Sequence, residues 1–97
     1  MKRRVFVIKK RMWQDGDLLG FEDGDVLVVK NTTPEIQLIL NRTAGIITEV
    51  NNLLCHAAII SRENGVPLLM GQAKITSELQ TGEFIEVDFD KKIWKKF

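Results

Sequence analysis

Residues 55–71 read CHAAIISRENGVPLLMG, and this segment carries the clearest helix signal in the chain. We expect the helix to begin just before or at Cys55 and to run through Glu63. Asn64-Gly65 ends it, because glycine readily takes the left-handed conformation that closes a helix, and a proline follows. The segment therefore predicts a short helix that leads into an apolar strand at residues 68–70.

Outward from this helix, short apolar runs alternate with turn signals. The runs are β-branched or aromatic and bounded by Gly, Asp or Asn, which is typical of strands, and they lie at residues 5–8, 26–29, 46–47, 84–87 and 93–94. Thr33 followed by Pro34 and Glu35 resembles a helix start, and residues 74–79 fit a further helical turn. The pattern predicts a sheet-rich domain with a few short helices.

The length and composition are those of one folded domain, which we take as residues 1–97. Hydrophobic residues make up 44% of the chain and charged residues 28%, which excludes a disordered or collagen-like protein. No apolar run approaches the roughly 20 residues that a membrane helix needs, so no membrane partner is expected. A chain of this size is also too short for a complete two-substrate enzyme.

Cys55 is the only cysteine, so the chain cannot form an internal disulfide. The basic amino terminus is a poor secretion signal, because its apolar run stops at Lys9-Lys10-Arg11 without a small-residue cleavage site. Both observations favour a cytoplasmic protein. Cys55 and His56 are the only residues of their types, whereas a structural zinc site needs about four ligands, so no metal site is expected.

Charge is unevenly distributed along the chain. Residues 1–11 carry six basic and no acidic side chains, residues 91–97 carry four basic and none acidic, and residues 12–90 carry four basic against thirteen acidic. Basic ends could form a nucleic-acid patch, but we favour solvated faces of terminal strands, where lysines blunt exposed edges. Nucleic acid is therefore not an expected partner.

His56 is the residue from which a functional argument can be made. In the first turn of a helix it lies beside backbone amides that have no partner within the helix, and near the positive end of the helix dipole. This setting disfavours the imidazolium and supplies donors for phosphoryl oxygens, so it suits a phosphohistidine. From the spacing alone, a histidine that only caps or packs at the helix end is the favoured alternative.

The same segment resembles the signature of the swivelling phosphohistidine domain, the mobile domain of PEP-utilising enzymes such as phosphoenolpyruvate synthase and pyruvate phosphate dikinase. Similar segments occur in enzyme I of the sugar phosphotransferase system and in some bacterial pyruvate kinases. Residues 24–29, 32–34 and 44–49 resemble the strand, helix start and strand before that signature, and residues 79–88 its closing strand. The resemblance thus covers residues 24–88. It makes a phosphohistidine, rather than a histidine that only caps or packs, the favoured interpretation of His56.

The resemblance implies an α/β fold, a three-layer β/β/α swivelling domain, in which His56 accepts a phosphoryl group from ATP or phosphoenolpyruvate. The chain has no Gly-x-Gly-x-x-Gly or Walker pattern, so it should bind no cofactor itself and the donor should sit on a partner. Nucleotide-binding and PEP- or pyruvate-type substrate domains on separate chains are the implied partners. The chain would then be a phosphotransferase component that needs them for turnover.

The residues around His56 depart from the family pattern of two glycines, a variable residue and threonine. Asn51, Asn52, Leu53 and Leu54 stand there, which predicts an altered phosphate loop and an apolar rim. Cys55, Ala57 and Arg62 complete the candidate phosphate-loop or docking residues. The altered loop keeps an alternative open, in which a non-catalytic docking or regulatory module retains the fold but has lost phosphotransfer.

Overall fold

The structure of the protein is a computed structural model that describes residues 1–51 and 56–97. Within these residues the chain forms one six-stranded sheet, in the order β4-β3-β2-β1-β5-β6. The strands are β1 (Lys2–Ile8), β2 (Val26–Val29), β3 (Gly45–Thr48), β4 (Leu68–Leu69), β5 (Phe84–Asp88) and β6 (Ile93–Lys96). The α-helices are α1 (His56–Asn64) and α2 (Ile75–Glu78), and the 3-10 helices are η1 (Asp15–Leu18) and η2 (Pro34–Leu38). The α/β fold expected from the sequence is confirmed.

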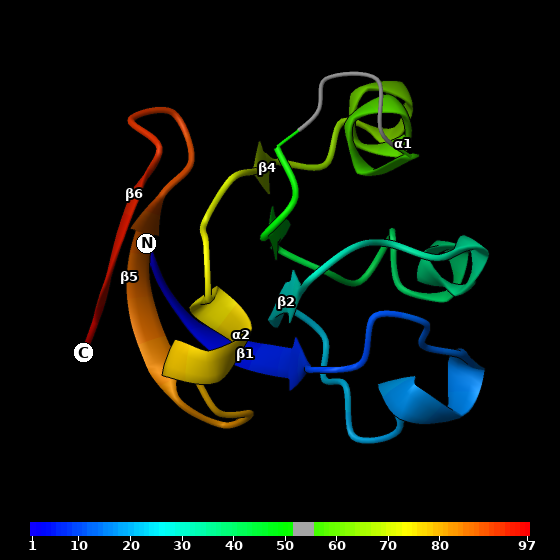
Figure 1. The fold of residues 1–97 in the computed structure, drawn as a ribbon. Helices are drawn as coiled ribbons and strands as arrows, with labels where there is room; N and C mark the ends of the chain where they lie inside the picture. The colour runs from blue at the N-terminus through cyan, green and yellow to red at the C-terminus, as the bar shows by residue number, and fades with distance from the viewer. Residues whose placement is uncertain (52–55) are drawn as a thin grey trace.

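The sheet has a parallel part and an antiparallel part, which meet at β1. The second half of β1 pairs in parallel with β2, with Val5 opposite Val26, and β3 and β4 continue the parallel order. The first half of β1 pairs with β5 in antiparallel fashion, with Arg3 opposite Ile85, and β6 extends that side. Figure 1 shows β5 and β6 curling away from the parallel strands toward the left of the view.

The parallel strands separate two hydrophobic cores, which explains their unbroken apolar sequences. Successive residues of a strand point to opposite faces, so Leu27 joins one buried cluster while Val28 joins the other. The first cluster lies under η1, η2 and α1, and the second lies under α2, β5 and β6. The parallel strands therefore form the middle layer, as the three-layer β/β/α architecture requires.

The helices lie where the sequence predicts them, but the one after Thr33 is a 3-10 helix and α2 is shorter than the predicted residues 74–79. The helix start at Thr33 leads into η2, a 3-10 helix whose amide hydrogen bonds run from Ile36 to Thr33 and from Ile39 to Ile36. Only Ile36 of its five residues is buried, and a 3-10 helix of this kind rarely extends beyond a few residues. Asp15, Gly16 and Asp17 are residue types typical of a turn, but here they form η1, which is closed by reciprocal bonds between Gln14 and Asp17.

Glu49 ties the end of β3 to the start of α2. One oxygen of its carboxylate accepts hydrogen bonds from the Thr76 amide at 3.0 Å and from the Thr76 hydroxyl at 2.6 Å. Burial raises the pKa of Glu49, but the bonds from Thr76, with the nearby charges of Lys30 and Arg11, outweigh it and hold the pKa below its ordinary value. A four-residue helix has little stability of its own, so this anchor helps to fix α2 in place.

Replacing Glu49 by glutamine is expected to lower the free energy of unfolding by about 1 kcal/mol at neutral pH. Because the folded-state pKa is depressed, this contribution is present above the unfolded pKa and is lost as the pH falls through the folded value. Urea titrations of both proteins between about pH 7 and pH 3 should therefore converge at the acidic end. A difference that stays constant down to the lowest pH would contradict the assignment.

Candidate functional site

Helix α1 begins at His56, whose side chain is exposed to solvent. The helix is attached to the first core by Ile60, while its end is closed by Gly65 in the left-handed region at φ 66°. The Ser61 hydroxyl and the Val66 amide reinforce this end, donating to the Val66 and Ser61 carbonyls respectively. A well-anchored helix thus presents the only histidine of the chain at its first position.

The amides of the first turn of α1 cannot find acceptors inside the helix, because an α-helical N–H bonds to the carbonyl four residues earlier. They point toward the end of the helix that carries partial positive charge. The arrangement gives His56 the surroundings that favour a bound or transferred anion.

The Thr32 hydroxyl lies 2.9 Å from Nδ1 of His56, within hydrogen-bond distance. Thr32 follows β2 and His56 follows β3, and these strands are parallel neighbours with Val29 opposite Thr48. Carboxyl ends of adjacent parallel strands meet at one edge of a sheet, which brings the two residues together across 24 positions of sequence. Among residues 1–51 and 56–97, no side chain or backbone group forms a hydrogen bond with the other ring nitrogen, Nε2.

Thr32 is itself held firmly. It is buried, at 6% exposed, and its amide donates to the side-chain oxygen of Asn31 at 2.8 Å. The backbone carbonyl of Asn31 in turn accepts a hydrogen bond from the indole N–H of Trp13 at 2.9 Å, and Trp13 is fully buried in the first core. A continuous set of contacts therefore joins the core to the imidazole.

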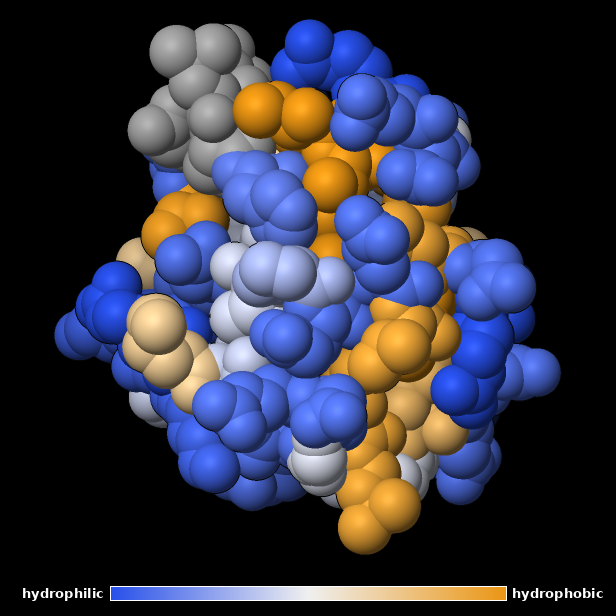
Figure 2. Space-filling view, turned by 90° about the vertical axis from the view of Figure 1, so that its right-hand side faces the viewer, coloured by the Kyte–Doolittle hydropathy of each residue, from blue (hydrophilic) through white to orange (hydrophobic). Residues whose placement is uncertain are grey.

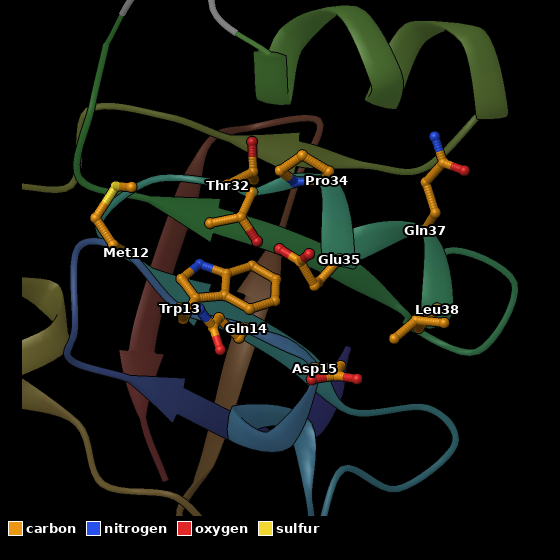
Figure 3. Close-up of a pocket in the computed structure, with 10 residues that line it drawn as sticks. Met12, Trp13, Gln14, Asp15, Thr32, Pro34, Glu35, Gln37 and Leu38 are labelled. Carbon is orange, nitrogen blue, oxygen red and sulfur yellow. The ribbon is translucent and has the colours of Figure 1, made fainter.

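Beside Thr32 lies an open cavity of about 610 Å³ (Figure 3). Its walls combine apolar groups with two acidic side chains that belong to η1 and η2, and the lining residues are Met12, Trp13, Gln14, Asp15, Thr32, Thr33, Pro34, Glu35, Gln37 and Leu38. In Figure 3 Thr32 lies beneath the start of α1, so the cavity and the imidazole share one wall.

The face that contains η1, η2 and α1 carries a band of apolar surface, orange in Figure 2, between hydrophilic areas. Leu19, Leu38 and Ile59 come from these elements or directly follow them, and each is exposed. Exposed apolar area of this kind often marks a place where another protein binds.

The remaining sequence-predicted site residues do not all gather around His56. Asn51 is exposed, and its side chain lies against Gly71 after β4. Ala57 is fully buried, so its side chain packs beneath the helix and offers no docking contact. Arg62 is exposed six residues further along α1, roughly 9 Å along the helix axis from His56. Asn52, Leu53, Leu54 and Cys55 lie outside the described residues.

Sequence reasoning missed Thr32 and Trp13 as parts of the site. Residues 32–34 were matched only to a helix start, and Trp13 lies outside the residues that carry the family resemblance. The one available signal was position, because Thr32 and His56 each follow a predicted apolar strand, and the structure shows that these two strands are parallel neighbours.

Across residues 1–51 and 56–97 no cluster of three or more His, Cys, Asp or Glu side chains could hold a metal ion. In the same part of the chain no helix is long and apolar enough to cross a membrane.

Comparison with known proteins identifies the class of this domain. Residues 21–92 match the family model described as PEP-utilising enzyme, mobile domain. The chain is 38% identical over 84 residues, 87% of its length, to a probable phosphoenolpyruvate synthase of Archaeoglobus fulgidus, and covers 11% of that protein. It is 44% identical over 68 residues, 70% of its length, to the uncharacterized phosphotransferase YvkC of Bacillus subtilis, and covers 8% of it.

A solved structure gives the same result for the fold. An enzyme I protein determined by NMR matches with a TM-score of 0.64 and 25% identity, over 81% of this chain and 33% of that one. The chain belongs to the PEP-utilising enzyme mobile domain family, whose members are parts of phosphotransferase enzymes. The resemblance found from residues 24–88 is confirmed, and the family match extends it slightly at both ends.

Proposed function

We propose that this chain is a phosphocarrier, which accepts a phosphoryl group from ATP or phosphoenolpyruvate on His56 and passes it to an acceptor in trans. The observation that carries the proposal is the exposed imidazole at the first position of α1. A buried histidine could only contribute to packing, whereas an exposed histidine beside helix amides can bind and accept a phosphoryl group. The family membership of the chain supports this chemistry.

The transfer needs little from the protein except position and charge stabilisation. The lone pair of Nε2 forms a bond to phosphorus, while the bond from phosphorus to the leaving oxygen of the donor breaks and its electrons stay with that oxygen. Amides in the first turn of α1 are suitably oriented to stabilise the oxygens of the transferred group. A second partner then removes the phosphoryl group by the same displacement at phosphorus.

Other domains must supply the donor and acceptor sites in this proposal. The chain spans about a tenth of the length of the curated relatives it matches, so those proteins contain much more than this domain. We assign those sites to nucleotide-binding and PEP- or pyruvate-type domains on separate chains, with no cofactor bound by this one. A cytoplasmic location, where ATP and phosphoenolpyruvate are available, completes the proposal.

The alternative of a docking module without phosphotransfer required His56 to be covered. The exposed ring argues against it, although Leu53 and Leu54, which would do the covering, lie outside the described residues. The apolar band of Figure 2 serves the carrier equally well, since a carrier must also dock.

The test is to incubate the chain with a candidate nucleotide-binding partner and ATP, or with a candidate phosphoenolpyruvate-binding partner and phosphoenolpyruvate, and to record its intact mass. We expect a gain of one phosphate that is lost in acid and kept in alkali, as for a phosphoramidate. The isolated chain with ATP alone serves as the negative control. Each partner is first shown to phosphorylate another domain of the family. If the mass of this chain then stays unchanged with all of these partners, the proposal is overturned.

A further inference from the structure

We propose that Thr32 is a positioning residue, whose hydroxyl oxygen accepts a hydrogen bond from Nδ1–H of His56 and so keeps Nε2 unprotonated for attack on phosphorus. The inference rests on the proposed function only for the biological role of Thr32. What it states directly is which ring nitrogen of His56 carries the proton in the free protein. The two atoms are 2.9 Å apart, and Thr32 is 6% exposed.

The distance alone decides which nitrogen can react. A phosphorus atom with its three oxygens has no room between Nδ1 of His56 and a hydroxyl oxygen 2.9 Å away. Attack must therefore come from Nε2, on the other side of the ring. Since His56 is exposed, that side is the one a donor can reach.

The direction of the hydrogen bond follows from the chemistry. An uncharged imidazole carries one N–H and one lone pair, and which nitrogen is protonated depends on the partner of the other. If the Thr32 hydroxyl donated to Nδ1, the proton would sit on Nε2 and neither nitrogen could attack. If the hydroxyl accepts from Nδ1–H, the lone pair lies on Nε2 and the ring is ready to react.

The same bond fits the product of the reaction. When Nε2 bonds to phosphorus and the leaving group departs with its electron pair, Nδ1 keeps its proton and the ring gains positive charge. The hydroxyl oxygen of Thr32 remains an acceptor for that more acidic N–H, so the hydrogen bond strengthens as charge develops. On transfer to the acceptor the N–P bond breaks and its electron pair returns to Nε2.

Thr32 is fit for this role because its own orientation is restricted. Its β-branched side chain has few rotamers, and its amide is bound by Asn31, which Trp13 ties to the first core. A hydroxyl on a mobile loop could bond to the imidazole but could not hold one orientation of the ring.

Three variants test the inference in the isolated chain. Thr32→Val removes the hydroxyl at nearly constant shape, and Thr32→Ser keeps it. Thr33→Val is the matched control, because the neighbouring Thr33 hydroxyl is buried without a hydrogen-bond partner in the described structure. His56 is the only histidine, so ¹⁵N NMR of the ring at alkaline pH reports its protonated nitrogen without ambiguity.

We expect Nδ1–H in the wild type, in Thr32→Ser and in Thr33→Val, and a shift toward Nε2–H in Thr32→Val. Phosphorylation by phosphoramidate, a small donor that needs no partner, should be about tenfold slower in Thr32→Val and should lose its preference for Nε2. Backbone amide spectra of the four proteins confirm that each is folded.

Predominant Nε2–H in the wild type, or an unchanged ring in Thr32→Val, would overturn the positioning role even if partners phosphorylate His56. Conversely, if the ring proton lies on Nδ1 as predicted but no partner phosphorylates His56, the positioning contact stands and only the carrier function is contradicted.

Discussion

Replacing His56 by alanine is expected to abolish completely the acid-labile phosphorylation that we propose for the chain. His56 is the only histidine, so no second imidazole can take over the role of nucleophile. The side chain is exposed, and among the described residues its loss deprives only the Thr32 hydroxyl of a partner, so the free energy of unfolding should fall by less than about 1.5 kcal/mol. Intact mass after incubation with partner and donor, together with urea unfolding, measures both effects.

A second substitution separates chemistry from packing at this position. His56→Gln keeps a polar side chain that can meet the Thr32 hydroxyl but has no nucleophilic nitrogen. It should be as inactive as the alanine variant and at least as stable. Acid-labile phosphate on either variant would mean that another side chain carries the phosphoryl group.

Most of the fold could be predicted because its strands have unambiguous sequences. Residues 26–29 are four consecutive apolar β-branched or leucine residues, and all four are buried because the parallel strands have a core on each face. The end of α1 was equally clear, because Gly65 takes the positive φ that the sequence indicated. The η1 helix was not foreseen, since an Asp-Gly-Asp turn and a single 3-10 turn have the same local sequence.

The candidate site was predicted only in part, and the limit is physical. The position of His56 at the start of a helix follows from local signals, but its contact with Thr32 depends on how two parallel strands are registered. No sequence periodicity encodes a hydrogen bond between loops that follow separate strands. The roles of Asn52, Leu54 and Cys55 stay predictions, since they lie outside the described residues.

Replacing Trp13 by alanine is expected to lower the free energy of unfolding by about 3–5 kcal/mol, the largest stability effect we predict. Trp13 is 1% exposed and belongs to the first core together with Leu18 and Ile36, and its indole N–H donates to the Asn31 carbonyl. Urea unfolding followed by far-ultraviolet circular dichroism measures the change. Trp94→Ala is the matched control: Trp94 is only half-buried, so its loss should cost clearly less.

Trp13→Phe distinguishes the volume of the tryptophan from its hydrogen bond. The smaller ring keeps much of the core filled but leaves the Asn31 carbonyl without the indole N–H, at a cost of about 1–3 kcal/mol. Asn31 also accepts a hydrogen bond from the Thr32 amide, so a displaced Asn31 should weaken the contact between Thr32 and His56. We therefore expect ¹⁵N NMR to show more Nε2–H at His56 than in the wild type. An unchanged ring in a destabilised Trp13→Phe protein would show that Thr32 holds the imidazole without support from the core. A change in the ring would instead mean that the packing of the first core determines which ring nitrogen of His56 carries the proton, through three consecutive hydrogen bonds.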